Sequence, residues 1–198
     1  MALTVYTAGE ILTAESLNDN FDYAVTVPIS VPSGLVYITG ASFAAQTTIS
    51  MASGVFTTTY KSFQVVLQVT SGADAQVTLR VNNAGSPRTG ANYLGAALRS
   101  ASDNSTANTG SPAGSTSVNM SGTHSGNRSN LTLSVYSPAE AAVATTFAAY
   151  GFGANNSNLA SAISSGGIYT TAEANDGLTF IYGAAVTGFY RVYGLSES

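Results

Sequence analysis

The sequence contains no cysteine, a single histidine, and few charged residues, which make up 8% of its 198 positions. The absence of cysteine excludes disulfides, thiolate metal ligands and a cysteine nucleophile. With only one histidine, a zinc site of the usual Cys and His type is excluded as well. The charged fraction is about a third of the usual share. Ser, Thr, Asn, Gln and the backbone must therefore supply most of the polar surface.

Positive charge is especially scarce, because Lys and Arg together number six and the formal net charge is -4. The six are spread from Lys61 to Arg191 and form no patch for a phosphate backbone, so no nucleic-acid partner is expected. No stretch approaches 18 consecutive apolar residues, so no membrane insertion is expected. Residues 1–5 lack the basic start and apolar run of a secretory signal. A protein of a virus particle assembled in a bacterial cytoplasm fits these absences, as does an ordinary cytosolic β protein.

Apolar residues make up 44% of the sequence, and in two stretches they recur at every second position. Apolar side chains occupy every second position from Phe63 to Val69, and again from Val77 to Val81. A helix cannot use this pattern, since residues two apart lie on different helix faces. The intervening residues 70–74 have turn chemistry, so residues 60–81 are predicted to form one β-hairpin. Two strands alone are marginally stable, so further strands must pack around it.

From Leu35 onward, short β runs alternate with Gly, Asn and Ser. This spacing predicts an all-β domain over residues 35–198, an antiparallel β-sandwich or jelly roll. Residues 100–130 are rich in Ser, Asn, Thr and Gly and on their own predict a flexible loop, which a neighbouring copy of the chain would most simply hold in place. Strands are expected near 35–39, 43–51, 54–60, 62–70, 75–82, 91–99, 115–121, 129–137, 143–152, 161–170, 178–183 and 187–194.

Residues 1–34 read as a separate N-terminal arm with a short helix at about 13–24. Thr13 fits an N-cap, and apolar residues recur along one face at positions 14, 17, 21 and 24. So short a helix is not stable alone, and its stripe must pack either on this chain's β domain or on sister chains around a symmetry axis. Both alternatives remain open. Pro28 and Pro32 then hold the chain extended as a linker to the β domain.

Four features follow one another along the chain: an opening segment (8–21), an aromatic-led strand (60–67), a Leu-Arg-Val strand with a glycine turn and a later tyrosine (79–93), and an ending in Phe-Tyr-Arg-Val-Tyr-Gly-Leu (189–195). In this order they resemble bacteriophage virion proteins of the tail-fibre, baseplate or head-fibre type. The resemblance implies a β-sandwich or jelly roll, a homotrimer, and attachment to other virion proteins through the N-terminal segment. It covers under half of the chain.

The resemblance further implies a structural protein of the virion, assembled in the host cytoplasm. The favoured expectation is a short trimeric tail or baseplate fibre that contacts the host surface. Ile11, Leu12, Leu17 and Phe21 would then bury an apolar stripe at a three-fold axis or on another virion protein. A capsid decoration or head-fibre protein with a stabilising role is the first alternative. A polysaccharide-degrading tail hydrolase is the second.

No pattern in the sequence indicates an enzyme, a cofactor or a metal site. An acyl-transfer triad needs a histidine as proton relay, and the only one, His124, lies in a Ser- and Gly-rich loop. Glycoside hydrolysis needs two carboxylates about 5 to 9.5 Å apart, and nothing marks such a pair. The acids that the β domain offers fall in predicted turns and strand ends: Asp74, Asp103, Glu140, Glu173 and Asp176.

One loop-like segment has the chemistry of a sugar-binding surface. Tyr150 and Phe152 are followed by Asn155 and Asn156. Flat rings cover the apolar faces of a sugar, and amides satisfy its hydroxyl groups. The favoured expectation is that Tyr150 and Phe152 are buried and close one end of the β barrel. The alternative is that the segment contacts a host-surface glycan.

Overall fold

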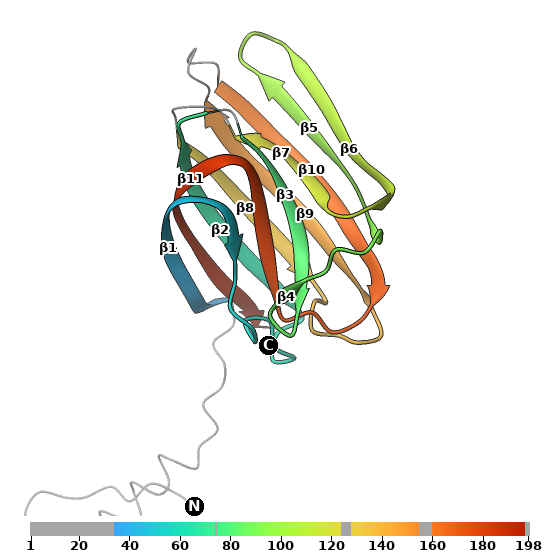
Figure 1. The fold of residues 1–198 in the computed structure, drawn as a ribbon. Coiled ribbons are helices and arrows are strands. Elements are labelled where there is room, and N and C mark those ends of the chain that lie inside the picture. Colours follow the sequence, from blue (N-terminus) through green and yellow to red (C-terminus); the bar gives the residue numbers. More distant parts are fainter. Residues whose placement is uncertain (1–33, 74, 124–127, 155–159, 197–198) are drawn as a thin grey trace, which may run out of the picture. The chain divides into compact units, whose positions relative to one another are not determined.

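The computed structural model describes residues 34–196, except 74, 124–127 and 155–159. These residues fold into one curled sheet in which every paired strand is antiparallel to its neighbours, with no helix among them (Figure 1). The all-β prediction is thus confirmed. The strands are β1 (Gly34–Ser50), β2 (Ser62–Ser71), β3 (Ala75–Asn83), β4 (Ser86–Pro87), β5 (Tyr93–Ala101), β6 (Thr106–Ser115), β7 (Val118–Thr123), β8 (Arg128–Tyr136), β9 (Ala144–Ala154), β10 (Ala160–Ala172) and β11 (Gly177–Ser196).

The long strand β11 organises the sheet. Along one edge it pairs with β1. Along the other edge its first part pairs with β3 and its second part with β2. The register moves by only two residues between the two ladders, from Val186 opposite Ser71 to Tyr182 opposite Val77. β2 and β3 therefore follow one another along the same edge of β11.

The predicted hairpin at residues 60–81 is wrong in its pairing. β2 and β3 are strands, as the alternation indicates, but each pairs with β11 and not with the other. Local periodicity identifies a strand and its buried face, but it carries no information about a partner more than a hundred residues away. A hairpin does occur further on, where Asn83 pairs with Ser86 across Ala84 and Gly85. Both turn residues have positive φ, at 50° and 72°, as a type I′ turn requires.

Three other predictions need correction. Residues 54–60 form turns instead of a strand, and the adjacent Val55 and Phe56 are both buried there. Residues 100–130 are not one loop: β6, paired with β5, and β7, paired with β3, lie within them. Pairs of short strands expected at each end of the domain are joined into the single long strands β1 and β11.

The remaining strands continue from β2 in the order β8, β9, β10, β5 and β6. The curl of the sheet brings β7 against β5 and β10, with which it is not paired. Two glycines make this close approach possible. A Cβ placed on Gly95 or Gly167 would lie 2.9 Å or 2.6 Å from Cγ1 of Val118 in β7. Val118 itself is fully buried.

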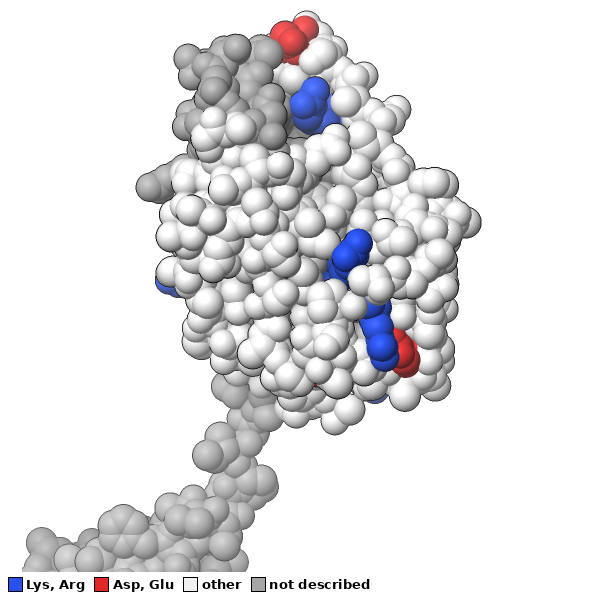
Figure 2. Space-filling model, viewed as in Figure 1, with Lys and Arg blue, Asp and Glu red and all other residues white. Residues whose placement is uncertain are grey.

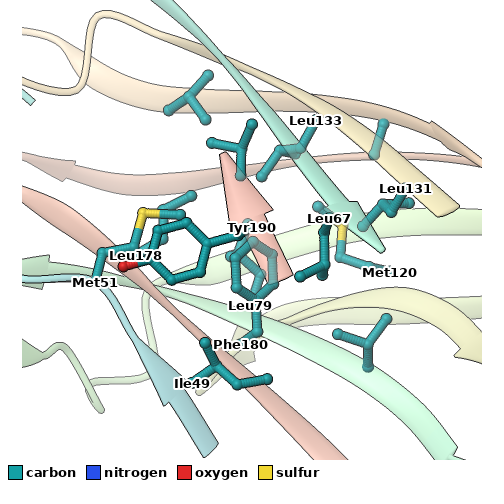
Figure 3. Packing of buried hydrophobic residues seen from close by; sticks show 14 of the residues in the cluster. Ile49, Met51, Leu67, Leu79, Met120, Leu131, Leu133, Leu178, Phe180 and Tyr190 are labelled. Carbon is teal, nitrogen blue, oxygen red and sulfur yellow. The ribbon is translucent and has the colours of Figure 1, made fainter. Parts of the chain in front are cut away.

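The core lies inside the curl and contains alternate residues of most strands (Figure 3). Leu67, Leu133 and Phe180 come from three different strands and are each at most 2% exposed. Burying such a side chain contributes about 1.5–3 kcal/mol. Turn residues Met51, Val55 and Phe56 close one end, where the Phe56 ring lies 4.6 Å from that of Phe63.

The predictions for the N-terminal arm, including the helix at 13–24 and the anchoring residues Ile11, Leu12, Leu17 and Phe21, lie outside the described residues and stay predictions.

Candidate binding surface

Tyr150 and Phe152 project from the solvent-facing side of β9. Their exposed fractions are 62% and 53%, while Phe147 and Ala149, on the opposite face of the same strand, are buried. The favoured expectation, that these two rings are buried and close the end of the barrel, is therefore wrong. The alternation of β9 explains the difference, since its buried positions are all odd-numbered and Tyr150 and Phe152 are at even ones. Asn155 and Asn156 lie outside the described residues.

The residues beside the two rings follow from the strand register. Tyr150 lies opposite Thr132 of β8 and Ser164 of β10. Phe152 lies opposite Asn130 of β8 and Ala162 of β10. Side chains directly opposite one another in an antiparallel sheet share a face, with Cβ atoms about 4.5–5.5 Å apart. Each ring is thus flanked by small or uncharged polar side chains, which leave its face and edges accessible.

The same face continues across β10 to the end of the sheet. Ser164 lies opposite Leu98 of β5, which lies opposite Asn108 of β6. An open hollow of about 280 Å³ occurs here, lined among others by Leu98, Asn108, Ser164 and Gly166. Small residues at the centre of this face produce the hollow, because Gly166 has no side chain to fill it. The exposed rings of Tyr150 and Phe152 and a shallow, uncharged hollow therefore lie on the same face of the sheet.

Charge is almost absent from this surface. The row of paired residues through Tyr150 runs from Asn108 to Gly40 and contains one charged side chain, Arg191. The guanidinium carbon of Arg191 lies 5.4 Å from the centre of the Phe189 ring, on the next row. On the side of the molecule shown in Figure 2, charged side chains are few, and most of the surface is uncharged. Such a surface suits a neutral ligand better than a charged one.

The acidic residues that the structure describes are each held in a local contact. Glu140 accepts a hydrogen bond from Lys61. Asp176 accepts hydrogen bonds from the Ser53 hydroxyl and the Gly85 amide. The hydroxyl of Ser105 and its amide lower the pKa of Asp103. These contacts fasten turns and strand ends, whereas Asp74 and His124 lie outside the described residues.

A polar cluster that the sequence did not indicate surrounds the fourth acid, Glu173. Arg88 donates to both of its carboxylate oxygens, at 2.8 and 2.9 Å, and the Tyr169 hydroxyl donates to one of them at 2.9 Å. The Tyr93 hydroxyl donates to the carbonyl oxygen of Arg88, and the Tyr93 and Tyr169 rings lie 4.8 Å apart. The cluster joins two short segments, 88–93 and 169–173, and the Arg88–Glu173 contact between them spans 85 residues, which is why spacing could not reveal it.

Burial raises the pKa of both Tyr93 and Tyr169, so each phenol is neutral near pH 7 and serves as a hydrogen-bond donor. A tyrosine acting as a general base needs the opposite shift. The cluster of Arg88, Tyr93, Tyr169 and Glu173, called the clamp below, therefore has a structural role: it joins the segment after β4 to β5 and β10. Within the described part of the chain, no group of three His, Asp or Glu side chains could hold a metal ion, and no helix could cross a membrane.

No family model and no curated protein matches this sequence. Among solved structures, the crystal structure of the marine PL-14 alginate lyase from Aplysia kurodai is similar at a TM-score of 0.25 and 8% sequence identity. The alignment covers 74% of this chain and 82% of the lyase chain. A likeness at this TM-score carries no argument about fold or activity.

Proposed function

We propose that this chain is a non-enzymatic structural protein of a bacteriophage virion, a short trimeric tail or baseplate fibre. Its N-terminal segment would attach it to other virion proteins, and its β domain would face the host. The proposal includes a β-sandwich of jelly-roll type as the arrangement of the curled sheet. The support from the sequence is the ordered set of features that resembles phage fibre modules.

The observation that carries the host-facing role is the exposure of Tyr150 and Phe152 on an uncharged sheet face. Large aromatic side chains usually bury much of their surface, so two on one strand that remain more than half exposed call for a ligand. The flanking Asn130, Thr132 and Ser164 supply hydroxyl and amide groups. Rings and uncharged hydrogen-bonding groups are what a neutral sugar requires. Three weak sites on one trimer would add up through avidity.

The experiment is competition for adsorption. Purified protein should compete with intact phage for host cells. Combining Tyr150→Ala with Phe152→Ala should raise the protein concentration that halves phage adsorption at least tenfold, because the sugar loses both stacking surfaces. Tyr136→Ala is the matched control. Tyr136 is also an exposed ring, but it lies four residues along β8 from Thr132, the partner of Tyr150, or about 13 Å away.

Three results would contradict this reading. If the double variant and the control compete equally well, the β9 rings do not contact the host surface. Protein that sits on the phage head and never affects adsorption would favour the capsid decoration or head-fibre alternative. If purified protein releases oligosaccharide from host polysaccharide, the polysaccharide-degrading tail hydrolase becomes the better explanation.

A further inference from the structure

Four strands pair with a single neighbour among the described residues and so have one unpaired edge: β1, β4, β6 and β7. The two longest of them are β1 and β6. β6 pairs only with β5, and β1 pairs only with β11. Every second residue along each free edge directs its N–H and C=O groups away from the sheet. Such an edge is a template for another strand, and monomeric proteins usually protect it with charge, proline, a bulge or a covering segment.

These two edges have little of that protection. No charged residue occurs in Gly34–Ser50 or in Thr106–Ser115. β1 has bulges between 37 and 39 and between 43 and 48, but residues 39–43 are regular. β6 is regular from Thr106 to Ser111, after which Pro112 has no N–H to donate. Each edge thus offers an uncharged regular stretch of five or six residues.

The directions of the strands decide how two copies could meet. Seven antiparallel steps separate β1 from β6, through β11, β2, β8, β9, β10 and β5, so β1 and β6 run in opposite directions. β6 of one copy can therefore pair antiparallel with β1 of a second copy that has the same orientation. Antiparallel pairing of β6 with β6 of a second copy would instead relate the two copies by a two-fold axis, so that they point in opposite directions.

We propose that the regular stretch of β6 (106–111) pairs edge to edge with that of β1 (39–43) in the next copy of the chain, so that the sheets continue from subunit to subunit. This inference rests on the proposed trimeric virion protein and deepens it. Repeated around an axis, the contact is heterologous and closes a ring when the rotation per subunit is 120°. It also places the N-terminal end of every β1 on the same side, as a fibre that attaches by its N-termini requires.

The surfaces beside the two edges are compatible with this contact. A hollow of about 270 Å³ at the β1 edge is lined by Tyr37, Gly40, Ser42 and Arg191, among others. The hollow at the β6 edge contains Leu98 and Asn108. Edge-to-edge pairing would bring the two hollows together into one uncharged furrow, except for Arg191. No like charges would face one another across it.

The absence of cysteine from the full chain allows a direct cross-linking test. Ser42→Cys in β1 is combined in turn with Thr106→Cys, Asn108→Cys or Gly110→Cys in β6, all of which are exposed in the free subunit. After mild oxidation, at least one pair should convert most of the protein to a covalent trimer on a non-reducing gel. Each single-cysteine variant should stay uncross-linked, because in a heterologous contact a residue does not meet its own copy.

Charge at the edges gives a second test. Asn108→Lys should weaken association at least tenfold, measured by sedimentation velocity, because it places a lysine on a pairing edge. Ser42→Glu in the same chain should restore much of the loss by facing that lysine in the next copy. Ala148→Lys is the control, since it adds the same charge at an exposed position of β9, a strand paired on both sides, and lines neither hollow.

The outcomes separate this inference from the proposed function. A trimer that forms without any cross-link and ignores the edge lysine would overturn the edge contact and leave trimerisation to the N-terminal segment. Covalent dimers of a single β6 cysteine variant would overturn it in favour of two-fold pairing. A monomer at all concentrations would overturn both the edge contact and the trimeric fibre.

Discussion

Gly167 is required for the close packing of β7 on the sheet. A Cβ there would lie 2.6 Å from Cγ1 of Val118 and 2.9 Å from the carbonyl oxygen of Leu94, so Gly167→Ala must displace a strand. We expect it to lower the free energy of unfolding by about 2–3 kcal/mol, measured in denaturant. Gly183→Ala is the control, because the nearest atom is 3.8 Å away. Equal effects of the two changes would show that the approach of β7 is looser than described.

Tyr182 gives the fold a predictable sensitivity to alkali. Burial raises its pKa above the value of about 10 for an unfolded chain. The neutral phenol therefore stabilises the fold fully below about pH 10, and the contribution is lost as the pH rises toward the folded pKa, by up to about 1.4 kcal/mol per pH unit. Tyr182→Phe keeps the ring and removes this titration. Its free energy of unfolding should fall less between pH 9 and 11 than that of the unchanged protein, and an identical fall would contradict the account.

At the scale of the elements, periodicity located most strands but none of the long-range partners. Phe63 to Val69 and Val77 to Val81 are buried at alternate positions as predicted. Their common partner β11 could not be found, because pairing over such a distance depends on the whole sheet. β6 was missed for another reason. Its Ser, Thr, Asn and Gly residues have no apolar face, and its strand conformation comes from the ladder to β5.

The candidate binding surface depends on more than the local sequence. The sequence selected Tyr150 and Phe152 by chemistry, but exposure depends on which face of β9 meets the core. The order of strands on either side then determines that Thr132 and Ser164 accompany Tyr150. No local pattern contains that information.

Two ion pairs join elements and should differ in their importance. Arg88 binds Glu173 through two hydrogen bonds, and Tyr169 supplies a third. Glu173→Gln should lower the free energy of unfolding by about 1–2 kcal/mol, because hydrogen bonds to a charged group are the stronger ones and solvent screens part of this cost. Glu140→Gln is the matched control at the single, more exposed contact with Lys61 and should cost below about 1 kcal/mol. A larger effect at Glu140 would contradict the clamp.

At the scale of the whole molecule, attachment by the N-terminal segment is a prediction from the sequence alone. Leu17→Asp combined with Phe21→Asp places two charges on the predicted apolar stripe. Incorporation into particles or trimer formation should fall at least tenfold, because burying an unpaired carboxylate is costly. The β domain should still unfold at the same denaturant concentration. Unchanged mass by light scattering and unchanged incorporation would show that the stripe packs only within its own subunit.

The account as a whole requires that the protein be part of a particle. The most direct measurement is to image purified phage by electron microscopy with antibodies against the β domain, and to count the copies at each labelled position. We predict three copies at the tail or baseplate, with the β domain away from the attachment point. Protein that is absent from purified particles and sediments as a monomer would contradict the central claim.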